Sequence, residues 1–185
     1  RLEALSGNLL ALMGLEHCLR FVPDDFKGQL QLSGWGGTLM VPTGGIAVSL
    51  NKWTHVAAVF DGPNKKVSIY IDGVLACSAD TNKTSLDLTQ VYQDDSFRIA
   101  NSCNDGRQLK GYISEARVWA KALNGNDLKN NMCYVDPATD GLLAYWRFNE
   151  KADGKKVEDD LTGHGYKATY SSSAMKWVDN VRCPE

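Results

Sequence analysis

Apolar residues occur along this chain in short runs that are separated by clusters of Gly, Pro and Asp. The N-terminal part contains the runs NLLALMG, HCLRFV, GQLQLSG and TLMV. Runs that are bounded by turn-forming residues are typical of β-strands. The longest uninterrupted runs, 56–60 and 142–146, have the length of a strand and fall far short of the roughly 20 apolar residues that cross a bilayer. The pattern therefore predicts short strands and no membrane span.

The clearest local signal predicts a β-hairpin around Asp72 and Gly73. These two residues separate the β-rich runs KKVSIYI and VLACSA, and Asp-Gly favours a type I′ turn because both positions tolerate a positive φ. Successive side chains alternate between the two faces of a strand, so Val67, Ile69 and Ile71 share one apolar face. We expect that face to point into a core.

The remaining runs complete an all-β pattern. The segment 56–60 is apolar on both alternating faces, which indicates a central strand, and 97–100 and 111–119 predict two more strands. Asn124 in LNGNDLKNN is a candidate cap for one short helical turn. After Pro137, the segments GLLAYWRFNE, DLTGHGYKATY and KWVDNV predict further strands. No repeat or long linker divides the chain, so we predict a single all-β domain over residues 1–185, an antiparallel two-sheet β-sandwich with at most one short helical turn.

Composition and charge narrow the classes of partner. The chain of 185 residues is 43% hydrophobic and 23% charged, as is usual for a globular domain, and its net charge is −2. Because Lys and Arg are scattered, we expect no nucleic-acid ligand. The sequence has no basic start followed by an apolar signal core, and Arg1 resembles a processing cut. We therefore expect that an export signal was removed, or that N-terminal residues or an upstream domain precede this segment.

The cysteines leave two interpretations open. Cys18, Cys77, Cys103, Cys133 and Cys183 include no C-x-x-C pair, so a structural zinc site is not expected. Cys133 and Cys183 bracket the C-terminal segment and are candidates for a disulfide in an exported protein, where closing the loop contributes about 4 kcal/mol in the chain-entropy model. The alternative is a cytosolic protein with buried reduced thiols.

Three blocks between residues 53 and 170 point together to one family. WTHVAAVFDG with VSIYIDGVL forms a strand and a hairpin. In FRIANSCNDGRQLKGYISEARVWAKALNGNDL, a Gly opens a strand that ends in an aromatic residue, and GLLAYWRFNE with DLTGHGYKAT joins an aromatic strand to Asp-x-x-Gly-x-Gly. The order resembles the laminin-G-like branch of the concanavalin A-like lectin/glucanase superfamily. In multi-repeat relatives the last block usually opens a domain, so its place here suggests a permuted arrangement or a clipped N-terminal partner.

The resemblance carries expectations about fold, ligand and location. It implies an antiparallel jelly-roll sandwich of the concanavalin A-like type that binds carbohydrate, often beside a calcium ion. The combination is similar to C-terminal domains of surface lipoproteins from gut bacteria that process glycans, so we expect a secreted, periplasmic or cell-surface protein of the outer-membrane lipoprotein type. One fold hosts many functions, and the activity therefore has to be argued from a site.

Catalysis finds little support in the sequence. A glycosidase needs two carboxyl groups that face one sugar bond, and strands carry them as alternating acids. Glu115 is a single acid on its strand, and the consecutive acids Glu158, Asp159 and Asp160 predict a solvated loop. Neither G-x-S-x-G nor a phosphate-binding Gly-rich loop occurs in the sequence. We therefore predict a non-catalytic chain.

Oxygen-rich turns are the candidate metal sites. Asp160 in DLTGHG is the best calcium candidate, because a hard cation takes carboxylate and carbonyl oxygens and the glycines let the main chain curl inward. A plain Asx or Gly turn explains the same residues equally. Asn101, Asn104 and Asp105 form a second such loop, for which the turn is the favoured explanation.

Aromatic residues in turns are the candidate sugar contacts. Trp35 in SGWGG and Tyr92 in VYQDD sit where a ring can be presented to solvent and stack on a sugar. Asn101, Asp105 and Arg107 are the expected hydrogen-bonding partners of the hydroxyl groups. Trp35 can equally cap the sandwich. The other candidates lie in apolar strands and are expected in the core: Trp53, Trp119 and Trp146.

These features support three hypotheses. The first is a module that binds a glycan or polysaccharide near a cell surface. The second is a structural or protein-adhesion domain that docks a neighbouring domain of the same protein, which a large exposed apolar patch would favour. The third is a glycosidase, which would need two carboxyl groups about 5 to 10 Å apart in a cleft.

Overall fold

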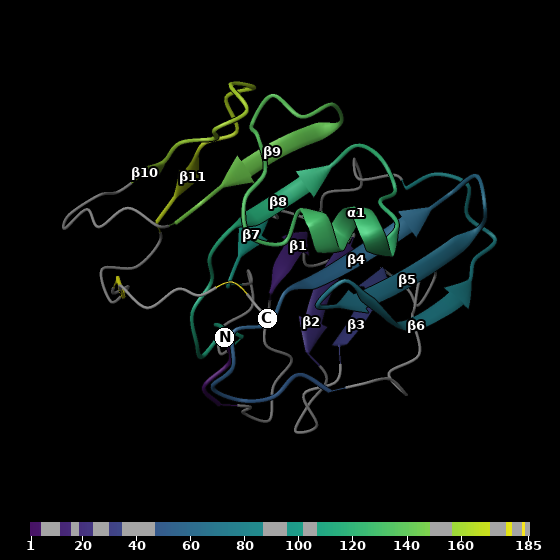
Figure 1. Ribbon diagram of the computed structural model, residues 1–185, viewed down its shortest axis with the longest axis horizontal. Coiled ribbons are helices and arrows are strands. Elements are labelled where there is room, and N and C mark those ends of the chain that lie inside the picture. The colour runs from purple at the N-terminus through teal and green to yellow at the C-terminus, as the bar shows by residue number, and fades with distance from the viewer. Residues whose placement is uncertain are drawn as a thin grey trace.

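The computed structural model shows an antiparallel β-sandwich with one short helix in the part of the chain that it describes (Figure 1). That one domain extends over residues 1–185 stays a prediction. The residues described are 1–4, 12–15, 19–23, 30–34, 47–86, 96–101, 107–148, 157–170, 177–178 and 183.

The first layer is a four-stranded sheet in the order β3-β2-β1-β7. Its strands are β1 (Met13–Leu15), β2 (Leu19–Pro23), β3 (Leu30–Gly34) and β7 (Arg98–Ile99). Each neighbouring pair is antiparallel. The strand predicted over 97–100 is therefore present in a shorter form.

The second layer contains the predicted hairpin. The strands β4 (Val56–Asp61), β5 (Lys66–Ile71) and β6 (Val74–Asp80) form a three-stranded antiparallel sheet. Asp72 and Gly73 have φ of 49° and 75°, which confirms the turn with two positive φ angles. The central strand of this sheet is β5, not 56–60 as predicted. Apolar residues on both faces of β4 indicate that both faces are covered. They do not indicate that the strand has a hydrogen-bonded neighbour on each side.

The C-terminal half adds two further strand pairs and the helix. Strand β8 (Ala116–Trp119) pairs with β9 (Leu142–Trp146), and β10 (Val157–Glu158) pairs with β11 (Ala168–Thr169). Helix α1 (Gly125–Asn130) lies between β8 and β9 in the sequence, and the side chain of Asn124 accepts a hydrogen bond of 3.0 Å from the amide of Asp127. The predicted cap is therefore confirmed.

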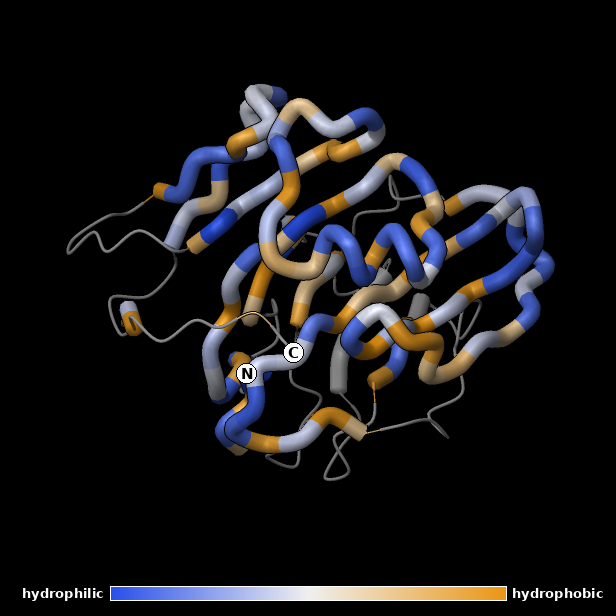
Figure 2. The backbone as a smooth tube through the Cα atoms, in the orientation of Figure 1, coloured by the Kyte–Doolittle hydropathy of each residue, from blue (hydrophilic) through white to orange (hydrophobic). Residues whose placement is uncertain are grey.

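The core lies between the two layers. Leu30 and Leu32 of β3 pack with Val67 and Ile69 of β5, and the last two are each only 1% exposed. Full burial of such a side chain contributes about 1.5–3 kcal/mol. A second cluster joins Ala116, Ala144 and Trp146 of the β8–β9 pair, which confirms the core position predicted for this tryptophan. Figure 2 shows the same pattern, with hydrophobic positions along the strands and hydrophilic positions at many turns.

Within the described residues, no helix is both long and apolar enough to span a bilayer.

Helix α1 packs closely against the turn at Gly73. A Cβ atom at position 73 would lie 2.7 Å from Cβ and 3.0 Å from Cα of Lys129. Glycine is thus required at this position for two reasons: the backbone has a positive φ, and the helix approaches the turn closely.

We expect Gly73→Ala to destabilise the fold by more than backbone strain alone, by roughly 2 kcal/mol or more, since α1 has to shift. The matched control is Gly163→Ala, because Gly163 has a similar φ of 79° and nothing within 4 Å of the added atom. Urea unfolding of both variants measures the difference. Equal losses of unfolding free energy would show that α1 does not press on the turn.

Candidate functional site

A cavity of about 1200 Å³ runs along β4 and the segment that leads into β8. Part of its lining is the apolar core described above. The lining also contains polar and aromatic residues, and we call the following group of them the polar wall: Arg1, Trp53, His55, Tyr112, Glu115, Arg117 and Arg147. Such a mixture of apolar surface and a few converging polar groups is typical of ligand sites.

Glu115 is the centre of the polar wall. One carboxylate oxygen accepts a hydrogen bond of 2.9 Å from Nε of Arg147, and the other accepts hydrogen bonds from Arg117, at 2.6 Å, and from the hydroxyl group of Tyr145. The backbone of Glu115 has a φ of 58°, an uncommon value for a residue with a side chain. Its amide donates to the carbonyl group of Arg147 at 3.0 Å, which keeps the strained residue in place.

Arg117 is almost completely enclosed, with 5% of its side chain exposed. Its guanidinium group donates to the carbonyl oxygen of Asn131 at 2.7 Å and lies 4.7 Å from the centre of the Tyr145 ring. Burial and the hydrogen bond to Glu115 raise the pKa of Tyr145, so this phenol stays a proton donor. Arg117 therefore holds the segment after α1 against β8 and β9.

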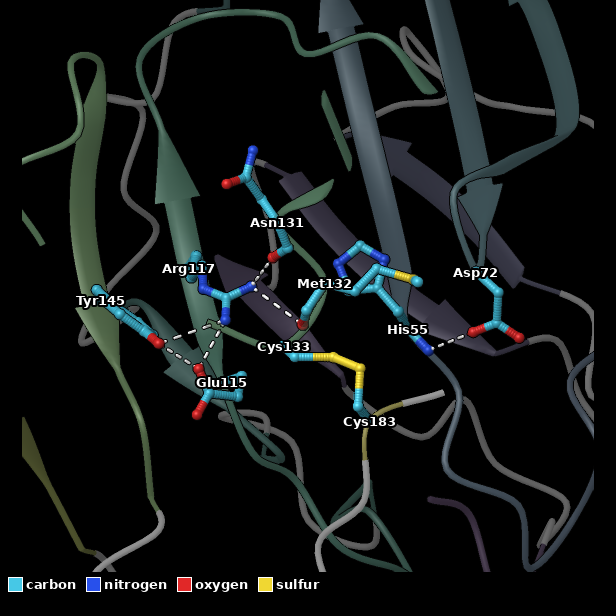
Figure 3. The surroundings of a disulfide bond; sticks show 9 residues. All are labelled: His55, Asp72, Glu115, Arg117, Asn131, Met132, Cys133, Tyr145 and Cys183. Carbon is cyan, nitrogen blue, oxygen red and sulfur yellow. Dashed lines mark hydrogen bonds and ion pairs between the residues drawn. A yellow bond between two sulfur atoms is a disulfide. The ribbon is translucent and has the colours of Figure 1, made fainter. Parts of the chain in front are cut away.

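A disulfide lies beside this cluster, between Glu115 and His55 in the view of Figure 3. Cys133 and Cys183 are bonded, with Cα atoms 5.4 Å apart, and Cys133 directly follows the two residues whose carbonyl groups face Arg117. The predicted pairing of these cysteines is thus confirmed. Cys77 is a free thiol, whereas Cys18 and Cys103 lie outside the described residues.

His55 faces the same cavity from the start of β4. Burial, with a smaller contribution from the nearby charge of Arg117, lowers the pKa of His55 to about 4 from an ordinary value of 6.5, although Asp72 opposes the shift. Its Nδ1 atom is buried and forms no hydrogen bond in the described structure. The ring is therefore neutral at physiological pH.

The polar wall does not have the arrangement of a glycosidase. Among the described residues, Asp61 and Glu115 are the carboxylates that line the cavity. Asp61 caps the β4–β5 turn through Asn64, and the length of β4, roughly 16 Å at 3.3 Å per residue, separates it from the His55 end. Glu115 is shared by two arginines. These residues do not supply a free acid and base on opposite sides of one bond.

Asp160 organises the DLTGHG turn. Its carboxylate accepts hydrogen bonds from the amides of Tyr145, Thr162 and Tyr166 at 3.0 to 3.2 Å, and from the hydroxyl group of Thr162. Burial alone would raise the pKa of Asp160, but these hydrogen bonds outweigh it and lower the pKa. The contacts are those of a turn anchor, and the described residues contain no cluster of three His, Cys, Asp or Glu for a metal ion. Calcium at Asp160 stays a prediction.

The expectation of a solvated loop at 158–160 is wrong for two of the three acids. Glu158 and Asp160 are 5% and 8% exposed, whereas Asp159 is exposed and pairs with Lys167 at 3.2 Å. Glu158 accepts from the amide of Phe148 and from the hydroxyl group of Tyr170. The acids are buried because donors from other strands satisfy them.

The structure describes two of the five residues predicted to bind a ligand. Trp35, Tyr92 and Asp105 lie outside the described residues. Asn101 and Arg107 are half-buried beyond the end of β7, and neither lines the cavity.

The polar wall contains residues that sequence reasoning missed. Trp53, expected in a core strand, precedes β4 and lies beside Tyr112 in the wall, with ring centres 6.4 Å apart. The available signal for the others was a charged residue within an apolar run, as Arg117 is in ARVW and Arg147 after LLAYW.

Comparison with known proteins identifies the family. The model of the concanavalin A-like lectin/glucanases superfamily, in its laminin-G form, matches residues 17–129. This chain belongs to that superfamily. A search of curated protein sequences gives no significant match.

Two solved structures are similar to the chain. A protein from Bacteroides ovatus, named for an inferred carbohydrate-binding role, is 27% identical, with a TM-score of 0.74 over 93% of this chain and 52% of that protein. The superfamily member described here thus spans about half the length of that protein. An S-layer domain-containing protein from Clostridium thermocellum is 21% identical over 70% of this chain and 64% of that one, but its TM-score of 0.37 is too low to support an argument.

The buried histidine predicts a loss of stability in mild acid. Because the pKa of His55 is about 4 in the folded chain and 6.5 is its ordinary value, the unfolded chain binds an extra proton between these values. The stabilisation is complete above pH 6.5 and is lost as the pH falls toward 4, by on the order of 2 kcal/mol. Chemical unfolding at several pH values should show this slope, and His55→Leu should flatten it. His164→Gln, which replaces an exposed histidine, should keep it; an unchanged slope in His55→Leu would contradict the assignment.

The disulfide should contribute to stability through the long loop that it closes. Replacing both Cys133 and Cys183 by Ala is expected to lower the free energy of unfolding by up to about 4 kcal/mol. The matched control is Cys77→Ala, which removes a half-buried free thiol. A reducing agent should lower the melting temperature of the unsubstituted chain and of the control, but not that of the double variant. Equal sensitivity in all three would show that the bond does not form in solution.

Proposed function

We propose that this chain is a non-catalytic module that binds a glycan or polysaccharide. The observation that carries the proposal is the similarity to the Bacteroides ovatus protein over 93% of the chain, at 27% identity, within a superfamily that contains lectins. The polar wall adds groups that sugar recognition uses: aromatic rings for the apolar face of the sugar, and guanidinium groups for its hydroxyls.

The same reasoning favours binding over hydrolysis. Glu115 is the acid of the polar wall, and its oxygens already accept hydrogen bonds from two arginines and a tyrosine. A general acid or nucleophile has to reach the sugar, so a carboxylate that is engaged in this way is suited to positioning its neighbours.

The proposal includes a location outside the cytosol. A disulfide between Cys133 and Cys183 supports an oxidising compartment, because thiols in the cytosol are kept reduced. A secreted, periplasmic or cell-surface protein, in which a neighbouring domain accompanies this one, agrees with the longer Bacteroides ovatus relative.

A glycan array tests the ligand class and the calcium prediction together. We expect the purified chain to bind a restricted set of glycans with calcium present, and to lose this binding with a chelator if a calcium ion sits near Asp160. Binding that survives the chelator would support the glycan proposal and contradict the calcium prediction. Absence of binding in both conditions would contradict the glycan proposal and favour a role in docking another domain.

A substitution in the polar wall locates the site. Trp53→Ala is expected to weaken glycan binding about tenfold or more, as truncation of an aromatic contact in a binding site typically costs over 1 kcal/mol. Leu75→Ala is the control, because Leu75 is 50% exposed on the β5–β6 hairpin and does not line the cavity. The loop residues Trp35 and Tyr92 form the competing site, and their alanine variants belong to the same titration. Unchanged affinity in Trp53→Ala with loss in those variants would move the site to the loops.

A further inference from the structure

Two guanidinium groups share one carboxylate in the polar wall. Arg117 and Arg147 both donate to Glu115, and within the described residues neither of them pairs with a second acid. The phenol of Tyr145, which also contacts Glu115, is neutral. Among the described residues, one positive charge is therefore left without a counterion in a partly buried position, and such a charge is costly unless an anion approaches it.

The exposure and the hydrogen bonds of the two arginines show which of them can reach a ligand. Arg117 is 5% exposed, and its two terminal nitrogens are engaged with Asn131 and Glu115. Arg147 is 33% exposed and reaches Glu115 through Nε. Its two terminal nitrogens make no hydrogen bond in the part of the chain that the structure describes. Because Arg147 lines the cavity and a third of its side chain is exposed, a ligand in the cavity can reach this side chain.

Hydrogen bonds to both its side chain and its main chain fix the position of Arg147. Its carbonyl oxygen accepts hydrogen bonds of 3.0 Å from the amide of Glu115 and from the hydroxyl group of Ser114. A guanidinium that is oriented before binding loses less conformational entropy when it binds. Arg147 therefore has the properties of a binding residue rather than of a mobile surface cation.

An exposed aromatic ring accompanies this cation. The guanidinium of Arg147 lies 5.2 Å from the centre of the ring of Tyr134, which is 55% exposed. The neighbours of Tyr134 are fixed, because Cys133 is in the disulfide and Val135 is 2% exposed. The guanidinium covers one face of the ring, and Tyr134 is not among the residues that line the cavity, so the ring offers its other face and its hydroxyl group to the part of a ligand that extends past Arg147.

We propose that Arg147, positioned by Glu115 and accompanied by Tyr134, binds the anionic group of an acidic glycan. A guanidinium fork matches a carboxylate or a sulfate with two parallel hydrogen bonds, which a neutral hydroxyl group cannot reproduce. The Tyr134 ring then contacts the sugar that carries the anion. The inference rests on the proposed glycan-binding function and specifies the class of glycan.

Matched pairs of polymers test the charge preference. Polygalacturonate carries carboxylates and its methyl ester does not, while dextran sulfate carries sulfate esters and dextran does not. We expect the purified chain to bind at least one charged polymer about tenfold more tightly than its uncharged partner. The difference should shrink as salt is raised, because the interaction is partly exposed. The pair that shows the difference identifies the anion as carboxylate or sulfate.

Substitutions distinguish binding at Arg147 from non-specific attraction to positive side chains on the surface. Arg147→Gln is expected to remove the preference, and Arg147→Lys to reduce it several-fold, since an ammonium keeps the charge and loses the fork. Lys66→Gln is the control, because it removes the same charge from an exposed residue of β5 that does not line the cavity. Tyr134→Ala changes an exposed side chain, so it should keep the fold and weaken binding even if Arg147→Gln fails to fold.

The possible failures are distinguishable. Tight binding of the acidic polymer by folded Arg147→Gln, or equal loss in Lys66→Gln, would overturn the assignment to Arg147. Equal affinity of the unsubstituted chain for charged and uncharged partners would overturn the acidic preference and leave glycan binding standing. Binding to none of the four polymers, together with no binding on the glycan array, would overturn both proposals.

Discussion

The carboxylate of Glu115 joins parts of the chain that are far apart in the sequence. It bonds Arg117 at the start of β8, Tyr145 of β9 and Arg147 directly after β9. Through Arg117 the same contact reaches the segment that precedes the disulfide. Removal of one partner from a buried ion pair costs about 3–5 kcal/mol in other proteins, because the remaining charge stays buried without compensation. The arrangement of the polar wall depends on this carboxylate, including the orientation of Arg147.

The same principle operates in the segment around β10, which contacts the C-terminal end of β9. Asp160 and Glu158 are buried, and they bind amide and hydroxyl groups that belong to other segments. In a small sandwich with short strands, apolar packing alone does not define how the peripheral strand pairs approach the core. Buried acceptors with several fixed donors add direction to that packing. The disulfide has a similar role for the segment that follows α1.

These contacts also shape what the chain can bind. Apolar packing between β3 and β5 accounts for the layers, whereas the polar wall lies where β4 and the lead into β8 face the cavity. A ligand there meets rings, a neutral histidine and an accessible guanidinium group. These groups of the polar wall suit the polar, ring-shaped and anionic ligand proposed above.

Local chemistry made much of the fold predictable from sequence. The Asp72–Gly73 hairpin, the Asn124 cap and the apolar face of β5 depend on residues within a few positions of one another, and all three are present. The prediction placed 56–60 at the centre of the sheet, but β5 is the central strand. The apolar character of 56–60 shows that both faces of this strand are covered, and it carries no information on its hydrogen-bonded neighbours.

The sequence by itself determined much of the strand pattern and the resemblance to the superfamily, and it made Cys133 and Cys183 candidates for a disulfide that the structure then showed. Only the tertiary structure decided which charged residues share a site. Glu115 meets Tyr145 and Arg147 across 30 and 32 positions of sequence, and Asp160 reaches Tyr145 across 15. Such partners are brought together by strand register and layer packing, which depend on the whole chain. For that physical reason an acid that looked solvated is buried, and an arginine that drew no attention is the accessible cation.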